Sequence, residues 1–402
     1  GLLTVVVAPA LAQTDSRTTT VLQRARPELD ALGMRRGSFL IFPSVDVSGI
    51  YDDNIYGTET GTKEDTILQL GPAVRVRSDW NQHSLSFQGN VRIRRHVDYD
   101  QEDYEAFGLR TNGRLDIQRD TYATAALGYR RDFEDRTSPD DADGIEPTQY
   151  SLSSVNIGFF NRWNRVSLDT RGQFQQYDYD DVATTSGITN NDDRDRSEYN
   201  LTVRGSYEIV PQYQAFLEGL LTSVDYDAAV DDGGVNRDND GYGLRAGARI
   251  DLTGVLFGDV FLGYQSRDYE DTTLKSADTY DVGVDLTWNA TPLTTVKGGV
   301  SRSISETTTS GASGTVGTNI STSVDHELLR NVILSGRVSY ATSDYEGISR
   351  SDDTLSAGLR GRYMMNRYLY FTLDYGYTDR ESNTDGNDYT NNIVTLTVRA
   401  QL

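Results

Sequence analysis

The 402-residue sequence has no cysteine and only three histidines, three methionines and eight prolines. Without cysteine, the chain has no disulfide scaffold, no thiolate metal site and no cysteine nucleophile. No run of about 18 apolar residues occurs, which excludes a membrane protein built from helices. The hydrophobic share of 37% is also below the roughly 45–50% of an average globular domain.

Positive charge is scarce as well. The chain has 38 Lys and Arg against 60 Asp and Glu, a formal net charge of −22. A nucleic-acid partner requires a basic face, so none is expected. The aromatic share of 10% is too high for a solvated, disordered chain. What is abundant is glycine, with 37 residues, and tyrosine, with 25, a composition that we interpret as all-β.

The first residues indicate export. Residues 1–12 read GLLTVVVAPALA, an apolar stretch that ends on small residues like those accepted by signal peptidase. We interpret it as a truncated signal peptide, with a short buried strand as the alternative. Residues 13–37 are then a periplasmic N-terminal segment, in which Pro27 interrupts a helical spacing. This segment is expected to dock a partner, to insert into the lumen of the remaining domain, or to stay a mobile tail.

From Ser38 onward the dominant pattern is alternation. In residues 242–252, every second residue is apolar or aromatic, and the intervening residues are Arg, Gly or Asp. Residues 85–94, 280–288, 369–377 and 394–402 divide in the same way. Successive strand residues point to opposite faces of a sheet. Each segment is therefore predicted to be a strand with one apolar and one polar face.

Short and long connections alternate between these strands. The short turns are expected at 79–81, 119–120, 163–164, 211–212, 253–254, 290–291, 330–331 and 366–367. Long acidic connections include residues 136–147, 180–197 and 227–240. The segments number about 18, with about 16 as the alternative if the Ser/Thr-rich stretch 300–325 is not a hairpin. Pro72 is a second uncertain position, since proline removes a ladder hydrogen bond.

The alternation of short and long connections between strands favours one architecture. A transmembrane antiparallel β-barrel has short periplasmic turns, long external loops, an even number of strands and an apolar face toward lipid. Closure satisfies every backbone hydrogen-bonding group, as the hydrocarbon layer requires. We therefore predict an all-β outer-membrane barrel over residues 38–402. A soluble β-solenoid or propeller is the alternative.

Residues 26–56 read RPELDALGMRRGSFLIFPSVDVSGIYDDNIY. This stretch resembles the opening of the putative outer-membrane beta-barrel porin 2 family, in its Arg-Pro-Glu-x-Asp, Gly-Ser-Phe, Phe-Pro-Ser and Tyr-Asp-Asp-Asn elements. The resemblance implies a large outer-membrane barrel of a kind often associated with exopolysaccharide synthesis and export. It brings no catalytic residues.

The polar faces of the predicted strands define a lumen wall that is rich in arginine. Its cations are expected to be Arg75, Arg77, Arg92, Arg94, Arg110, Arg114, Arg130, Arg171, Arg204, Arg245, Arg249, Arg267, Lys297, Arg337, Arg360, Arg362 and Arg399. Its carboxylates are expected to be Asp46, Asp116, Asp169, Glu208, Asp251, Asp259, Asp281, Asp285, Asp325 and Asp374. The excess of cations favours selection of anions. The alternative is that neighbouring Arg and Asp pair off and only stiffen the wall.

Three functions remain open. The first is an exit conduit for an acidic exopolysaccharide, the second a general diffusion porin for small anions, and the third a closed structural or anchoring barrel. His96 and Asp98 share a strand face, but no motif for nucleophilic, phosphate or metal chemistry accompanies them. We therefore expect no enzyme, metal or cofactor. The expected partners are outer-membrane lipid, lipopolysaccharide and a periplasmic polysaccharide-export protein.

Overall fold

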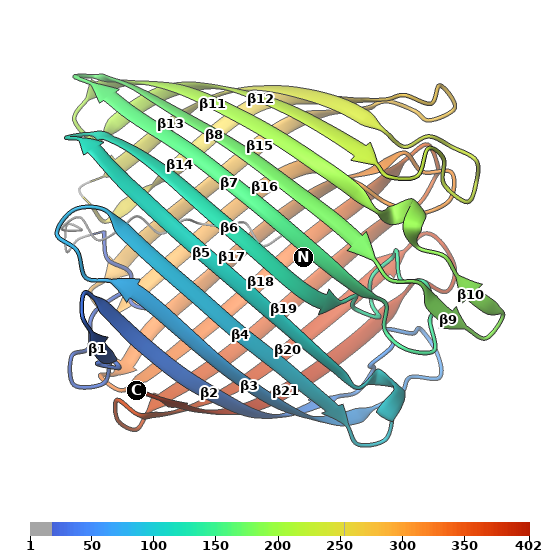
Figure 1. Cartoon of the computed structure of the whole chain (residues 1–402), viewed down its shortest axis with the longest axis horizontal. Helices are drawn as coiled ribbons and strands as arrows, with labels where there is room; N and C mark the ends of the chain where they lie inside the picture. Colours follow the sequence, from blue (N-terminus) through green and yellow to red (C-terminus); the bar gives the residue numbers. More distant parts are fainter. Residues whose placement is uncertain (1–17, 253) are drawn as a thin grey trace.

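The protein is a closed antiparallel barrel, seen in a computed structural model that describes residues 18–252 and 254–402. The main sheet has 19 strands, which are the short β1 (Met34–Arg36) and 18 barrel strands. Pairing of the first barrel strand with the last closes the sheet (Figure 1). The barrel strands are β2 (Phe39–Asp52), β3 (Asp65–Ser78), β4 (Ser84–His96), β5 (Tyr104–Gln118), β6 (Thr121–Phe133), β7 (Gln149–Trp163), β8 (Val166–Tyr179), β11 (Arg196–Val210), β12 (Tyr213–Tyr226), β13 (Asn239–Leu252), β14 (Leu256–Tyr269), β15 (Ala277–Thr291), β16 (Thr294–Ser305), β17 (Gly314–Leu329), β18 (Val332–Glu346), β19 (Ser351–Met364), β20 (Leu369–Ser382) and β21 (Tyr389–Gln401).

Alternation along each strand gives the barrel an apolar outer face. On β13, Tyr242 and Leu244 are 55% and 64% exposed, while Arg245, which follows Leu244, points inward to Glu218. The same holds on β15, where Tyr280 is 75% exposed and its neighbour Asp281 is buried. In water such a surface would be unfavourable, and in a bilayer it is the face that contacts lipid. Among the described residues, no helix is long and apolar enough to cross a membrane.

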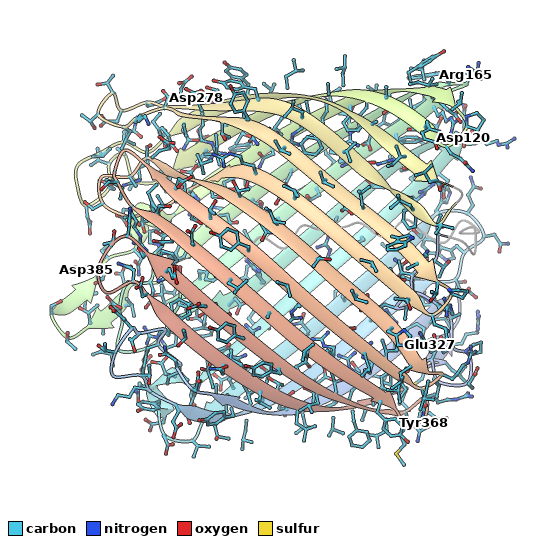
Figure 2. All side chains as sticks on the ribbon, turned by 180° about the vertical axis from the view of Figure 1, so that it is seen from behind. Asp120, Arg165, Asp278, Glu327, Tyr368 and Asp385 are labelled. Atoms are coloured by element: carbon cyan, nitrogen blue, oxygen red, sulfur yellow. The ribbon has the colours of Figure 1, made fainter. Side chains whose placement is uncertain are left out.

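The two ends of the barrel differ as predicted. One end carries the tight turns, including those marked by Asp120 and Arg165 in Figure 2, and the other carries the long loops, such as the one with Asp385. The predicted turn at 290–291 was wrong by two residues. A register shift after Trp288 extends β15 to Thr291, so the turn consists of residues 292–293. The predicted loop 180–197 is also not uniform, since it holds the hairpin of β9 (Val182–Thr184) and β10 (Gly187–Thr189) and the 3-10 turn η2 (Asp192–Arg194).

Both uncertain stretches of the sequence are strand. Residues 300–325 lie in the hairpin of β16 and β17, which settles the number of barrel strands at 18 rather than 16. Pro72 lies within β3 and pairs with Val45 of β2. On its other side, the ladder from β3 to β4 has no pairs at Gly71 and Pro72 and resumes at Ala73 without a change of register. The proline therefore interrupts the hydrogen-bond ladder locally and leaves the strand intact.

The hairpin of β16 and β17 leans into the barrel at its outer end. β15 pairs with β16 only from Gly283 onward, so the outer part of β15 is bonded to β14 alone. Ile304 and Val316 are instead buried against Ala277 and Tyr269, which lie on the inner face of β14 and β15. This apolar contact brings the loop of residues 306–313 over the lumen.

The first described residues lie at the end with the tight turns, inside the barrel. The predicted signal peptide, residues 1–12, lies outside the described residues, as does part of the segment 13–37. Residues 18–33, here called the N-terminal strap, form a series of turns. β1 follows and pairs with the start of β2. Within the strap, Val21 and Leu29 pack against Ile333 and Met364 on the inner faces of β18 and β19.

Candidate transport pathway

The structure places the predicted lumen cations on the face opposite to the exposed apolar side chains, and it divides them by their partners. Besides Arg267, which bonds Glu306, half of them form ion pairs with carboxylates: Arg92, Arg114, Arg171, Arg204, Arg245, Arg249, Arg360 and Arg399. The other half have no carboxylate within 4.0 Å in the described part of the chain: Arg75, Arg77, Arg94, Arg110, Arg130, Lys297, Arg337 and Arg362.

Most of the unpaired arginines lie side by side. The lumen face of β3 to β6, here called the cationic wall, carries Arg75, Arg77, Arg92, Arg94, Arg110, Arg114 and Arg130. Within the described residues only Arg92 and Arg114 of this group bond carboxylates, Asp132 and Asp116. The set extends from the periplasmic end of β3 to the outer end of β6. A continuous strip of positive charge therefore follows the length of the lumen.

Aromatic rings hold several of these guanidinium groups. Arg114 stacks on Tyr122, with its Cζ 3.7 Å from the ring centroid, and Tyr122 in turn stacks on Phe160 at 5.0 Å. Arg130 lies over Tyr150 at 5.4 Å. A cation over an aromatic face is attracted to the ring and keeps its N–H edge available. These rings were not predicted as lumen residues, although alternation places Tyr122 and Tyr150 on the polar face.

The lumen face of β11 to β15, here called the paired wall, is the opposite case. Glu218 is 3% exposed and accepts hydrogen bonds from Arg204 at 2.7 Å and Arg245 at 3.0 Å. Asp259 accepts bonds from Arg204 at 2.8 Å and from Arg249 at 2.7 and 2.8 Å. Arg196, Arg204, Arg245 and Arg249 all have carboxylate partners on this wall. Arg267 is paired with Glu306, in the loop after β16.

Glu218 is a buried lumen carboxylate that the sequence did not identify. Around it, residues 215–221 read AFLEGLL, with apolar residues on both faces of β12. Phe216 is buried on the lumen side, where Arg204 stacks on it at 4.0 Å, and Leu217 is 64% exposed on the lipid side. Alternation was ambiguous at this strand. A cross-strand register would have been needed to place Glu218 opposite Arg204.

The periplasmic mouth is lined by the N-terminal strap along β15 to β20. Val21 and Leu29 pack against Ile333 and Met364, and all four are buried. The strap is also held by polar contacts: the Val21 N–H donates to Thr295 Oγ1 at 3.0 Å, and Tyr370 donates to the Leu29 carbonyl at 2.6 Å. It therefore follows the rim over a third of the barrel strands.

One buried ion pair anchors the strap. Arg26 is 3% exposed and its Nη2 lies 2.7 Å from Oε2 of Glu327, which is 5% exposed. Arg24 contacts the same carboxylate at 3.3 Å. A charge at such a buried position is costly unless it is paired. The Arg26–Glu327 pair therefore ties the strap to the inner end of β17.

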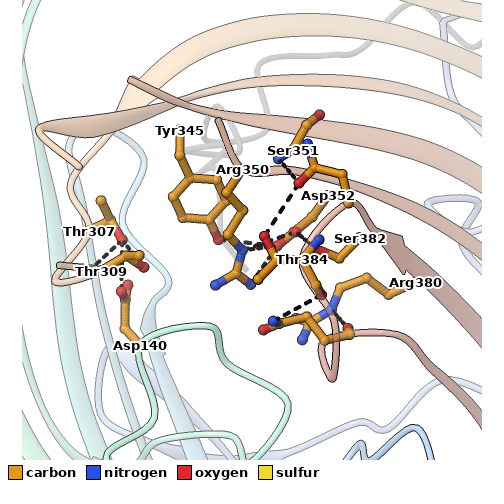
Figure 3. Close-up of polar contacts among 12 residues, drawn as sticks. Asp140, Thr307, Thr309, Tyr345, Arg350, Ser351, Asp352, Arg380, Ser382 and Thr384 are labelled. Atoms are coloured by element: carbon orange, nitrogen blue, oxygen red, sulfur yellow. Dashed lines mark hydrogen bonds and ion pairs between the residues drawn. The ribbon is translucent and has the colours of Figure 1, made fainter. Parts of the chain in front are cut away.

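The outer mouth is crossed by residues 134–148, here called the outer lid, which connect β6 and β7. Asp140 accepts a hydrogen bond from Thr307 Oγ1 at 2.8 Å (Figure 3). It also accepts one from the Thr308 N–H at 2.9 Å, and both threonines are in the loop that follows β16. Arg380, at the end of β20, donates to the Thr137 carbonyl at 3.0 Å. Arg136 is buried against Glu102 with a bond of 2.8 Å. The lid is therefore bonded to several sides of the mouth.

Two carboxyl groups in the described outer loops, Asp141 and Asp195, have strongly raised pKa values. Burial raises the pKa of Asp141 in the lid to about 6, with a contribution from Glu134, and Arg136 only partly opposes this. Burial also raises the pKa of Asp195 to about 6, with help from Asp178 and Asp192. The outer mouth thus contains groups that change charge at mildly acidic pH.

His96 and Asp98, which were expected on one strand face, do not pair, because β4 ends at His96. The Nδ1 atom of His96 lies 3.6 Å from Asp103 Oδ1, and the Asp98 N–H bonds to Asp65 instead. The chain bends directly after His96, which turns Asp98 away. Within the described residues no group of three or more His, Cys, Asp or Glu could hold a metal ion.

An antiparallel barrel with an apolar exterior and a charged lumen defines the class of protein as an outer-membrane β-barrel. The chain belongs to the family described as putative beta-barrel porin 2, which matches residues 26–402. It is therefore a porin-like channel protein of the outer membrane. No curated protein matches the chain.

Solved structures of outer-membrane proteins align with the barrel at low identity. OpdO of Pseudomonas aeruginosa has a TM-score of 0.47 and 13% identity, with 90% of this chain and 97% of that chain covered. OpdK of the same organism, solved with vanillate, has a TM-score of 0.46 and 9% identity over 90% and 99% of the two chains. A ferric enterobactin receptor mutant, also from P. aeruginosa, has a TM-score of 0.48 and 8% identity, over 93% and 81%.

Proposed function

We propose that the protein is a passive conduit for anions, and that its physiological cargo is an acidic exopolysaccharide leaving the cell. The observation that carries the proposal is the cationic wall. Five of its seven arginines, namely Arg75, Arg77, Arg94, Arg110 and Arg130, have no carboxylate partner within the described residues. Unpaired cations along a water-filled lumen attract anions over a long range and bond them in a bidentate manner at contact.

The aromatic rings of the same wall support a sugar cargo over a simple salt. Tyr122, Phe160 and Tyr150 are half-buried in the lumen wall beside cations, and the apolar faces of pyranose rings pack on aromatic surfaces. A chain of acidic sugars would use both features at once, whereas a small inorganic anion would use only the charge. A general diffusion porin for small anions is the second candidate, supported by the same arginines.

A closed structural barrel is the third candidate, and the strap and lid favour it, since each covers part of one mouth. Against it, lumen arginines in the periplasmic half of their strands remain solvated: the Arg171 and Arg249 side chains are 58% and 53% exposed. An interior that was packed shut would have buried them. We therefore propose a conduit whose ends are restricted by folded segments.

Planar-bilayer recording under a KCl gradient tests the conduit. We expect a channel with a chloride-to-potassium permeability ratio above one. A cation-selective or non-conducting protein would contradict the proposal. The polymer is tested in the native cell, where deletion should abolish secretion of uronate-containing polysaccharide. Normal secretion in the deletion strain, together with anion selectivity in the bilayer, would leave the small-anion porin.

A further inference from the structure

Two arginines at the periplasmic end of the cationic wall share one aromatic ring. Arg75 and Arg77 are separated by one residue on β3, so they lie on the same face. Their Cζ atoms are 5.0 and 5.2 Å from the ring centroid of Phe42, the residue directly opposite Arg75 on β2. We propose that these three residues, here called the arginine clamp, form a recognition site for the carboxylates of an acidic sugar chain. The inference rests on the proposed conduit function.

The clamp is held in place although its arginines are free. Both guanidinium groups are exposed, and in the described residues neither has a hydrogen bond or an ion pair. The ring beneath them is fixed from its edge by Gly33 at the end of the strap. A Cβ added at Gly33 would lie 2.7 Å from Phe42 Cε1, and its φ of +70° favours glycine. Stacking on a fixed ring orients the guanidinium planes and leaves their donor edges toward the lumen.

The neighbouring strand shows which ligand this arrangement takes. Arg92 and Arg94 on β4 are also separated by one residue, and their Cζ atoms lie 5.4 and 5.6 Å from the ring centroid of Tyr104. In this second copy the donors are occupied, because Arg92 bonds the carboxylate of Asp132 and Arg94 bonds the side-chain oxygen of Gln69 at 3.0 Å. The same geometry therefore holds a carboxylate where the protein provides one. The clamp at Phe42 has the same donors and an open place for a carboxylate from outside.

The location of the clamp and its two donor groups favour a polymeric ligand. The clamp lies within four residues of the periplasmic end of β3, so it is met early by a chain entering from the periplasm. Two donor groups on one face bind two carboxylates of one chain, and the second contact is then intramolecular. A polymer of uronates gains from this arrangement, whereas a monovalent solute contacts one arginine at a time.

The test uses hexagalacturonate added to the periplasmic side of the full-length protein in a planar bilayer. We expect brief blockades of the chloride current, with a binding constant weakened about tenfold or more in R75Q/R77Q. The matched control R337Q/R362Q removes two other unpaired lumen cations, on β18 and β19, and should weaken binding less than about threefold. A neutral oligosaccharide of equal length should not block.

Any of three results would refute the proposed site. The first is an equally weakened binding constant in both double variants, the second is equal blockade by the neutral sugar, and the third is unchanged blockade in R75Q/R77Q. Correct assembly of each variant is checked by the heat-dependent gel shift of folded barrels. R75K/R77K provides a second variant, which keeps both charges but loses the planar fork, and should retain anion selectivity while losing polymer affinity.

The experiments distinguish a failure of the clamp proposal from a failure of the conduit proposal. Loss of blockade in R75Q/R77Q with chloride selectivity intact supports both. If the wild type is cation-selective or does not conduct, the conduit is refuted, and calorimetry of the solubilised protein with hexagalacturonate then decides the clamp. Binding that depends on Arg75 and Arg77 in that assay supports the site, and binding that does not overturns it.

Discussion

The two walls of the lumen use the same side chain in opposite ways. On the paired wall, Glu218 and Asp259 bind Arg204, Arg245 and Arg249 into one network across β11 to β14. On the cationic wall, the arginines rest on aromatic rings and mostly have no acid beside them. The number of lumen charges alone therefore does not determine selectivity. A paired arginine presents little field to a solute, whereas an unpaired one presents most of its charge.

The different roles of the paired wall and the cationic wall have a physical reason. Hydrogen-bonded networks stiffen a sheet because removal of one member leaves the others buried and unsatisfied. Cations stacked on rings keep their place at a smaller electrostatic cost and remain available to ligands. The paired wall is therefore expected to determine stability, and the cationic wall to determine selectivity. Variants on either side test this separation.

The largest effect is expected from the strap, whose residues 19–29 lie against β15 to β20. In E327A the buried Arg26 loses its partner, at a cost of about 3 kcal/mol or roughly a hundredfold in docking. We expect a higher single-channel conductance with an unchanged chloride-to-potassium ratio. In the control E28A, whose partner Arg330 is exposed, conductance should stay as in the wild type. A change of selectivity in E327A would show that the strap determines more than the width of the mouth.

The next effect concerns the paired wall. E218A leaves Arg204 and Arg245 each with one acid, Asp259 and Asp281, so we expect a loss of about 2 kcal/mol in the free energy of unfolding. The urea midpoint in lipid vesicles, followed by the gel shift of the folded barrel, measures it. R110Q on the cationic wall should change stability by less than about 0.5 kcal/mol. Equal losses in the two variants would contradict the comparison.

A smaller effect is expected from neutralising part of the cationic wall. The triple variant R94Q/R110Q/R130Q removes three cations that have no acid partner in the described chain, and should lower the chloride-to-potassium ratio about threefold. The control R171Q/D169N removes an ion pair within β8 and keeps the net charge. Reversal potentials under a salt gradient measure both. If the control lowers the ratio as much, paired arginines contribute to selectivity after all.

Much of the fold followed from the sequence because strand alternation has a period of two and lipid accepts one face. The positions of most turns, the strand number and the inward direction of Arg245 and Arg249 all come from that period. The pattern failed at β12, where apolar residues on both faces hid Glu218. It also failed at the end of β15, where a register shift makes the strand two residues longer than predicted, to Thr291.

The site was less predictable because its decisive features are contacts between distant residues. Arg26 and Glu327 are 301 positions apart, and Asp140 meets Thr307 across the mouth. Which arginine is paired depends on cross-strand register, and alternation alone does not supply it. The sequence thus predicted a cation-rich wall, but it did not separate the paired arginines from the free ones.

The smallest effect is expected from pH, through the lid that spans the outer mouth above both walls. Because burial raises the pKa of Asp141 to about 6 from an ordinary 3.8, the docked lid is most stable when this carboxyl is protonated, and that stability is lost as pH rises through 6. Channels should therefore close more often at pH 5 than at pH 7.5, by roughly threefold, with the same selectivity at both. D141N should remove the dependence and stay at the acidic behaviour. If the permeability ratio moved with pH instead of the closed fraction, the titrating groups would lie along the walls, and the lid would not be the pH-sensitive element.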